Sequence, residues 1–290
     1  MSRRFLLLVN PSAGGGRALE RLPAAEAEFD RLGAEFRTVR TREIGHAAEE
    51  AGAAVERGET VAAMGGDGLL RPLAGVLAGT EAALAILPGG RGNDLARVLG
   101  IPTEPRDAAR LAVEGGERLL DVGYVGDTPY LGIASFGFDS DANRIANDAR
   151  LVRGNLVYVY AALRALVAWK PATFTARVDG ETHEVTGYSM GVANSKAYGG
   201  GMYVAPQAVL DDGKLDVLAK DAVSKLRFLA ALPRYFKEQP ITDPSVHTWI
   251  GEEIEVDASR AFEIYADGDP IGATPARISV RPRCLRVIAP

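Results

Sequence analysis

The chain of 290 residues is long enough to form two domains, each with a hydrophobic core of its own. Its composition, 47% hydrophobic and 24% charged, is that of a soluble globular protein, and no apolar run approaches the roughly 20 residues of a membrane span. The formal net charge of −5 argues against nucleic-acid binding, and the single cysteine, Cys284, excludes an internal disulfide framework. We therefore expect a cytoplasmic protein.

From Phe5 to about Asp121, short apolar runs alternate with longer amphipathic ones. The short runs are "FLLLVN", "AEFRTVRT", "ETVAAMG" and "AALAILP", and helix-like segments such as "GHAAEEAGAAVERG" and "RPLAGVLAG" follow them. This β–α alternation predicts a mainly parallel sheet with helices on both faces. We expect an α/β domain over residues 1–121.

From about Val122 the pattern changes to strand-like segments joined by turns, and Asp179-Gly180 is a strong hairpin signal. Two helical runs interrupt these strands, at about Asn155–Trp169 and Ser224–Phe236. We therefore expect a mostly antiparallel β domain over residues 122–281.

Three strands of the first half are predicted to end in loops rich in glycine: "NPSAGGGRA" (10–18), "GGDG" (65–68) and "PGGRGND" (88–94). In a parallel sheet these loops share the carboxyl edge, where open α/β folds bind ligands. Glycine lets the backbone approach a phosphate, and the helix N-termini that follow offer free N–H donors. The alternative is that these glycines only form tight turns. Neither a P-loop motif nor a Rossmann fingerprint is present.

Asp67 stands inside the second of these loops. A carboxylate beside a phosphate would repel it unless a cation lay between them, so we interpret the loop as a site for a metal-bridged nucleotide. The alternative role for Asp67 is that of a helix N-cap.

Taken together, the blocks "VNPSAGGGRA", "MGGDG", "PGGRGNDLARVLGIP", "VANSKAYGGGMYVAPQAVLDDGKLDVL" and "YADGDPIG" resemble the successive motifs of the diacylglycerol kinase catalytic family, in particular its bacterial lipid kinase branch. The resemblance covers nearly the whole chain. It implies ATP- and Mg²⁺-dependent phosphorylation of a lipid hydroxyl, such as that of diacylglycerol, between a nucleotide-binding α/β domain and a β-sandwich lipid-substrate domain. It also implies that residues 282–290 return to the first domain.

The resemblance assigns roles to particular positions. It implies nucleotide contacts in the first half, at Asn10, Thr41, Gly65, Gly66, Asp67, Gly68, Gly90 and Asn93, and we add Arg91 as a further candidate. It implies a network of Mg²⁺ and water around Asp67, Asp94 and Asp121. In "DGD" it implies an acidic pair at the reacting hydroxyl, Asp267 and Asp269, with the second residue as proton acceptor. A structural Mg²⁺ would be bound by the carbonyls of Val209 and Lys214 and the carboxylate of Asp212.

The chain departs from the family pattern at several of these positions. Family members mostly read G-G-D-G-T-x-N-E, whereas here Leu69 replaces the Thr, and Arg71-Pro72 replaces the Asn-Glu pair. Arg91 stands where Thr is usual, and Asp269 stands where Glu is typical. We hypothesise that Arg71 or Arg91 binds phosphate through its planar guanidinium. The alternative is a surface ion pair.

Other functions remain open at this level. A kinase for a sphingoid base or for NAD shares the GGDG loop, and the lost Thr and Asn-Glu residues also fit a catalytically impaired nucleotide or lipid sensor. A lipid carrier is a third reading. The basic and apolar run "SKLRFLAALPRYFK" (224–237) fits either peripheral contact with an anionic membrane or an ordinary domain helix. The sequence leaves the oligomeric state open, a homodimer included.

Overall fold

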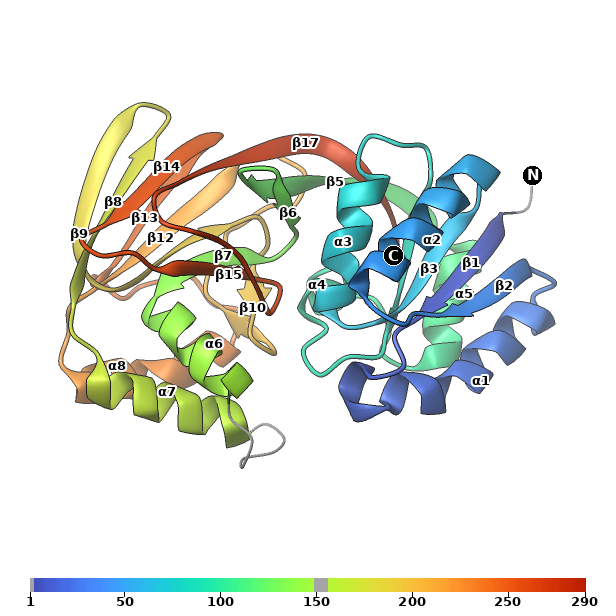
Figure 1. Cartoon of the computed structure of the whole chain (residues 1–290), viewed down its shortest axis with the longest axis horizontal. Helices are drawn as coiled ribbons and strands as arrows, with labels where there is room; N and C mark the ends of the chain where they lie inside the picture. The colour runs from blue at the N-terminus through green and yellow to red at the C-terminus, as the bar shows by residue number, and fades with distance from the viewer. Residues whose placement is uncertain (1–2, 149–155) are drawn as a thin grey trace.

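The computed structural model describes residues 3–148 and 156–290 and has two halves joined by long strands (Figure 1). Both chain termini lie in the first half (Figure 1). No helix among the described residues is long and apolar enough to cross a bilayer.

The first half is built on a parallel sheet in the order β2-β1-β3-β4. Its strands are β1 (Arg4–Val9), β2 (Glu35–Arg40), β3 (Thr60–Gly65) and β4 (Leu84–Pro88). The last strand of the chain, β17 (Ala276–Ala289), adds to this sheet, because Val287 and Ile288 pair in parallel with Leu84 and Ala85 of β4. The predicted mainly parallel sheet is confirmed.

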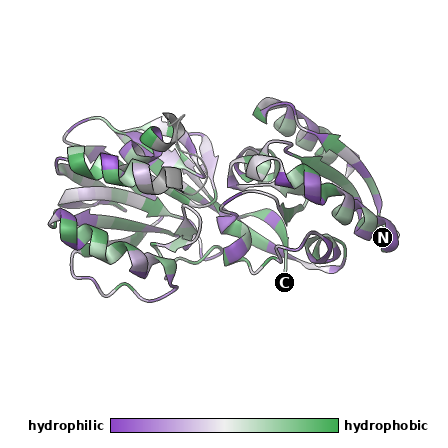
Figure 2. Ribbon diagram, turned by 90° about the horizontal axis from the view of Figure 1, so that it is seen from below, coloured by the Kyte–Doolittle hydropathy of each residue, from purple (hydrophilic) through white to green (hydrophobic). Residues whose placement is uncertain are grey.

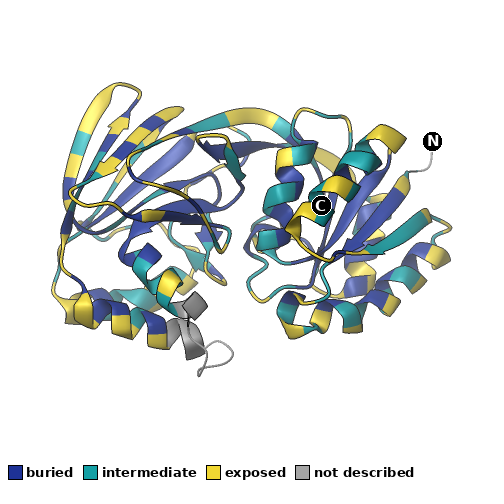
Figure 3. Ribbon diagram, in the orientation of Figure 1, coloured by how far each residue is buried: buried dark blue, intermediate teal, exposed yellow. Residues whose placement is uncertain are grey.

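Helices cover both faces of this sheet, as predicted. They are α1 (Arg17–Arg31), α2 (Ile44–Arg57), α3 (Asp67–Leu77), α4 (Asp94–Val98) and α5 (Pro105–Glu114), with a short 3₁₀ turn, η1, at Ala13–Gly15. Side chains of β1 alternate between two cores: Leu7 packs with α1 and α5, and Leu8 packs with α2 and α3. Because both faces are covered, the central strands are buried and read as continuous apolar runs (Figure 3).

Two antiparallel strands connect the halves. β5 (Gly116–Val125) pairs with β17 along most of its length, and β6 (Thr128–Tyr130) forms a hairpin with β5. Figure 1 shows β17 running from the second half back to the sheet of the first. Continuous strands therefore join the two halves.

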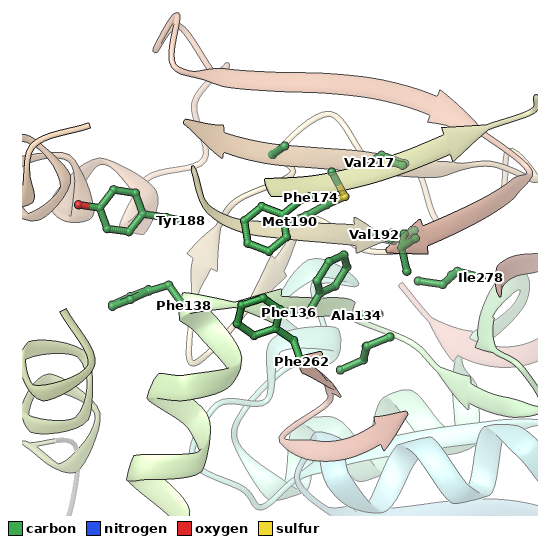
Figure 4. Close-up of a cluster of buried hydrophobic side chains, with 14 of the residues drawn as sticks. Ala134, Phe136, Phe138, Phe174, Tyr188, Met190, Val192, Val217, Phe262 and Ile278 are labelled. Carbon is green, nitrogen blue, oxygen red and sulfur yellow. The ribbon is translucent and has the colours of Figure 1, made fainter. Parts of the chain in front are cut away.

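The second half is antiparallel, as predicted. Its strands are β7 (Ile133–Gly137), β8 (Ala172–Val178), β9 (Glu181–Ala193), β10 (Ala197–Tyr198), β11 (Met202–Tyr203), β12 (Leu215–Asp221), β13 (Val246–Gly251), β14 (Glu253–Ala258), β15 (Glu263–Ala266) and β16 (Asp269–Ala273). Asp179 and Gly180, both at positive φ, form the predicted turn between β8 and β9. The core holds many aromatic rings, among them Phe136, Phe174 and Phe262 (Figure 4).

Helices lie on one side of this half: α6 (Phe138–Asp148), α7 (Leu156–Ala168) and α8 (Lys225–Ala231), with the 3₁₀ helix η2 (Leu232–Phe236) after α8. The two predicted helices correspond to α7 and α8–η2, although predicted residue 155 lies outside the described residues. Pro233 stands where the α-helix changes to a 3₁₀ turn, because proline removes a backbone donor. The sequence prediction missed α6, since "SFGFD" reads as the end of a strand.

Candidate functional site

The three glycine loops meet at the carboxyl edge of the parallel sheet. A Cβ atom on Gly14 would lie 2.5 Å from the carbonyl oxygen of Gly89, and one on Gly66 would lie 3.1 Å from Cα of Gly90. Only glycine allows these backbones to approach so closely. The loops thus form one continuous surface of backbone.

Three predicted nucleotide contacts are engaged in holding this edge together. Asn10 Oδ1 accepts hydrogen bonds from the amide and hydroxyl of Ser12, at 3.1 and 2.9 Å. Thr41 is buried, and its amide donates to the Val9 carbonyl at 2.8 Å. Asn93, at φ 52°, bonds to both the amide and the carbonyl of Gly90. The side chains of Asn10 and Asn93 therefore shape the loops, whereas Thr41 is held through its backbone.

A cavity of about 410 Å³ opens beside these loops, between the two halves. The first half contributes Gly66, Asp67, Gly68, Arg91, Gly92 and Asp94 to its wall, and the second contributes Gly132, Ser135, Gly200, Asp267 and Gly268 among others. The "YGGG" segment reaches the first half here, since the Gly200 amide donates to Asp94 Oδ2 at 2.9 Å.

Two carboxylates from different loops meet at this cavity. Asp67 accepts hydrogen bonds from the amides of Asp94 (3.1 Å) and Leu95 (3.2 Å), so it caps α4 and not its own helix α3. A point at the Cβ position of Gly92 lies 3.1 Å from Asp94 Oδ2 and 3.3 Å from Asp67 Oδ2.

The environment of Asp94 disfavours its charge. Burial raises the pKa of Asp94, and the negative charge of Asp67 raises it further, against the opposing effect of the Gly200 and Gly201 amides. Its Oδ1 atom is buried without a hydrogen-bond partner among the described residues. A divalent cation would satisfy this oxygen and neutralise both carboxylates, so the donor set fits a hard metal ion such as Mg²⁺.

The acidic pair lies on a hairpin facing these loops. Asp267 and Gly268, both at positive φ, form the turn between β15 and β16, so the segment is a hairpin as well as an acidic motif. The Asp267 carboxylate accepts hydrogen bonds from the amides of Leu131 and Gly132, each at 2.9 Å. Burial, followed by the charge of Asp67, raises the pKa of Asp267 to about 7, although the two amides act in the opposite direction.

Asp269 lies at the rim of the cavity. Its Oδ2 is 3.7 Å from the Cβ position of Gly68, a residue of the cavity wall, and 3.3 Å from Nη2 of Arg71. Arg71 thus forms an ion pair with a carboxylate of the second half, whereas Arg91 is exposed and lines the cavity.

The structure does not bring Asp121 to this cavity. Its side chain is fully buried and accepts hydrogen bonds from the amides of Gly213 and Arg283, each at 2.6 Å. Burial raises the pKa of Asp121, and the charges of Asp212 and Asp211 contribute to the rise. Its partners place it beside the turn for which a structural Mg²⁺ was predicted.

That turn is exposed to solvent. Val209, Asp212 and Lys214 are all exposed, and Asp212 Oδ1 accepts a hydrogen bond of 3.0 Å from the Lys214 amide. Among residues 3–148 and 156–290, no group of three or more His, Cys, Asp or Glu side chains is arranged to hold a metal ion. The predicted structural site has one carboxylate and two carbonyls, so it remains a prediction.

A second cavity of about 340 Å³ adjoins the first and shares Ile133, Ser135, Asn143, Tyr198 and Gly199 with it. Its wall is largely apolar and includes Phe138, Leu163, Met202, Leu229, Leu232 and Phe236. The sequence analysis did not identify this cavity, because its wall combines β7, β9 and β12 with α6, α7 and α8. Such a space suits a hydrocarbon chain.

One carboxylic acid stands in the wall of this apolar cavity. Burial raises the pKa of Asp139 to about 6, while hydrogen bonds with Tyr198 and Ser189 lower it. The sequence analysis missed Asp139 and Tyr198. The one available signal was the acidic residue of "FD", which directly follows an apolar strand.

Both halves of the chain match known protein families, and the whole chain matches known proteins. Residues 4–125 match the diacylglycerol kinase catalytic domain, and residues 132–289 match the YegS C-terminal NAD kinase beta sandwich-like domain. The chain is 33% identical to a diacylglycerol kinase of Mycobacterium tuberculosis, over 98% of this chain and 94% of that one. It is 31% identical to a Pseudomonas aeruginosa protein named "Probable lipid kinase YegS-like", over 99% and 94% of the two chains.

A solved structure shares the fold. The crystal structure of a diacylglycerol kinase from Bacillus anthracis superposes with a TM-score of 0.76 at 22% sequence identity. The match covers all of this chain and 97% of that one. The two halves described here are therefore an arrangement that a solved protein also adopts.

Proposed function

The chain belongs to the diacylglycerol kinase family and is a lipid kinase, and we propose that it transfers the γ-phosphate of ATP, with Mg²⁺, to the hydroxyl of diacylglycerol. The observation that carries this proposal is the cavity between the halves. Its wall joins the backbone of two of the glycine loops and two carboxylates on one side to the acidic hairpin on the other. Phosphoryl transfer requires mainly such positioning and charge neutralisation.

ATP would bind at the carboxyl edge of the parallel sheet. Backbone amides of the glycine loops would bind its phosphates, and Arg91, exposed in the cavity wall, would add a fixed positive charge. Arg71 is less suited to this role because its guanidinium pairs with Asp269.

Asp67 and Asp94 would hold the metal ion. Bound Mg²⁺ neutralises charge on the triphosphate and polarises its phosphoryl oxygens. The buried Oδ1 of Asp94, which lacks a partner among the described residues, supports this assignment. Asp121, which contacts the 211–214 turn, would support the site only from a distance.

The acidic hairpin would receive the lipid hydroxyl. Asp269 lies at the cavity rim beside Gly68 and would accept the hydroxyl proton as phosphoryl transfer proceeds. Asp267 has both oxygens bonded to backbone amides, so it fixes the hairpin against the loop that precedes β7. The apolar cavity next to the site would accommodate an acyl chain.

The same half would contact the membrane that holds the lipid. Two segments, 160–170 and 224–237, contain six cations and no acidic residue in a chain of net charge −5: Arg164, Lys170, Lys225, Arg227, Arg234 and Lys237. Lys225 Nζ donates to the Val167 carbonyl at 2.8 Å, which places α7 and α8 side by side.

The exposed side of α7 is also apolar. Val167 on α7 and Leu226 on α8 are 80% and 81% exposed, whereas an ordinary domain helix presents polar residues to water. Figures 2 and 3 show hydrophobic and exposed residues on these helices. Leu163 and Phe236 are exposed and also line the apolar cavity, which links this surface to the proposed acyl site.

A substrate panel tests the proposal. The protein would be incubated with Mg²⁺ and radiolabelled ATP together with diacylglycerol, a sphingoid base or NAD. Label in phosphatidate, and little in the other two products, is expected. Label in sphingoid-base phosphate or in NADP instead would show that the acceptor is the sphingoid base or NAD and not diacylglycerol. Binding of ATP without any phosphorylated product would indicate a sensor.

A further inference from the structure

We propose that Arg71 is a positioning residue for Asp269. The inference rests on the proposed function, because it concerns the carboxylate proposed to accept the proton.

Arg71 and Asp269 are in contact although they lie 198 residues apart in the sequence. Nη2 of Arg71 is 3.3 Å from Oδ2 of Asp269. Arg71 projects from the second turn of α3, and Asp269 begins β16 on the opposite half. The contact therefore bridges the cleft that separates the proposed nucleotide and lipid sites.

The lengths of the Arg71 and Asp269 side chains explain why the two residues meet. Aspartate is one methylene shorter than glutamate, so its carboxylate lies closer to the hairpin backbone. Asparagine at position 71 would be too short to reach it, whereas the longer arginine meets it from α3. The Arg71 side chain is only 15% exposed, against 38% for Asp269, so the guanidinium is held in place while the carboxylate keeps access to solvent and substrate.

Charge gives a second reason. Asp67, Asp267 and Asp269 all lie close to the first turns of α3, and repulsion among their negative charges would displace the hairpin. The Arg71 cation lowers the pKa of Asp267 and forms an ion pair with Asp269. Its Nε is buried without a hydrogen-bond partner among the described residues, so the Asp269 contact is the polar interaction that fixes the guanidinium.

A double-mutant cycle tests the coupling. The variants are Arg71→Asn, Asp269→Glu and the combination of both. We expect each single substitution to lower kcat about tenfold or more with little change in KM for ATP, because a displaced base slows the chemical step. We expect kcat of the combined variant to stay within about threefold of the worse single variant, because Arg71 acts through the carboxylate at position 269.

The pH profile separates positioning from a structural role. Loss of the cation should move the acidic limb of the kcat profile of Arg71→Asn to higher pH, because the Arg71 cation lowers the pKa of Asp267 on the same hairpin. Arg277→Asn is the matched control, because Arg277 forms an exposed ion pair with Glu253 far from the cleft. If Arg71→Asn does not fold, Arg71→Met, which keeps an unbranched apolar stem in place of the arginine stem, takes its place.

Additive losses in the combined variant would overturn the proposal, and so would an unshifted pH profile. A raised KM for ATP with unchanged kcat in Arg71→Asn would assign Arg71 to phosphate binding instead. These outcomes require an active wild-type kinase, so they are distinct from failure of the proposed function, in which wild type itself forms no phosphorylated lipid.

Discussion

The backbone amide of Asp94 donates a hydrogen bond of 3.1 Å to Oδ2 of Asp67, and this contact joins two glycine loops that are separate in the sequence. It brings two carboxylates to one point of the cleft wall, and the burial of Asp94 raises its pKa. A cation between the two carboxylates would offset the repulsion between their negative charges. The proposed metal site follows from this relationship.

Replacement of Asp67 by Asn should weaken metal binding. The amide keeps one acceptor for the α4 backbone but lacks the charge that the cation requires. We expect Mn²⁺ affinity, measured by titration calorimetry on the ATP-bound protein, to fall about tenfold or more, and kcat about 100-fold. Asp30→Asn, at an exposed position at the end of α1, is the control. Unchanged Mn²⁺ binding in Asp67→Asn would place the cation elsewhere.

Arg91 should contribute to ATP binding. Its side chain lines the cavity and is exposed, so Arg91→Ala removes a charge without disturbing a core. We expect KM for ATP to rise about tenfold with a smaller change in kcat, because charge-assisted contacts to phosphate are strong. Arg106→Ala, on the exposed side of α5, should leave KM unchanged. An unchanged KM for ATP in Arg91→Ala would show that Arg91 is a solvated surface residue without a role in ATP binding.

Asp267 should make stability depend on pH. Its pKa is raised from 3.8 to about 7, so the folded protein holds this proton more tightly than the unfolded chain does. The resulting stability is present at low pH and is lost as the pH rises through this window. We expect the free energy of unfolding of the metal-free protein to fall from about pH 4 to about pH 7.

Asp267→Asn should show a smaller fall over the same range, measured by urea denaturation. Asp94 and Asp139 have raised pKa values too and contribute with the same sign in both proteins. The comparison between variant and wild type therefore isolates Asp267. Identical pH dependences would show that the Asp267 carboxyl ionises at its ordinary pKa.

The surface of α7 and α8 should bind anionic vesicles. Cosedimentation with phosphatidylcholine vesicles containing about one third phosphatidylglycerol should be strong at low salt and weak at high salt, since each cation near the membrane contributes about 1 kcal/mol. We expect the double variant Val167→Asp/Leu226→Asp to bind these vesicles at least about tenfold more weakly than wild type. Ile44→Asp, at an exposed position on α2, is the control. Equal binding of wild type, the double variant and the control would show that this surface is not the membrane-binding site.

Much of the fold could be predicted because its signals are local. The β–α alternation of the first half comes from strands buried on both faces, which are continuous apolar runs, and from helices that follow them at short intervals. The Asp179-Gly180 turn has a dipeptide preference that does not depend on the rest of the chain. By contrast, α6 follows a buried strand without a break, so its start at Phe138 gave no local signal.

The candidate site could be predicted only in part, for a related reason. The convergence of the loops follows from the parallel sheet, but side-chain partners depend on contacts between distant segments. The Asp121 carboxylate bonds to Gly213 and Arg283, and Arg71 meets Asp269 across the cleft. Neither partnership has a signature in sequence spacing. The apolar cavity is likewise formed by side chains from widely separated elements.

The most direct test is a crystal structure with Mn²⁺ and a non-hydrolysable ATP analogue, in which anomalous scattering locates the metal. The account predicts a Mn²⁺ peak between the carboxylates of Asp67 and Asp94. It also predicts that the triphosphate lies against the glycine loops and its γ-phosphate faces the hairpin of Asp267 and Asp269. A metal and nucleotide bound outside this cleft would contradict it.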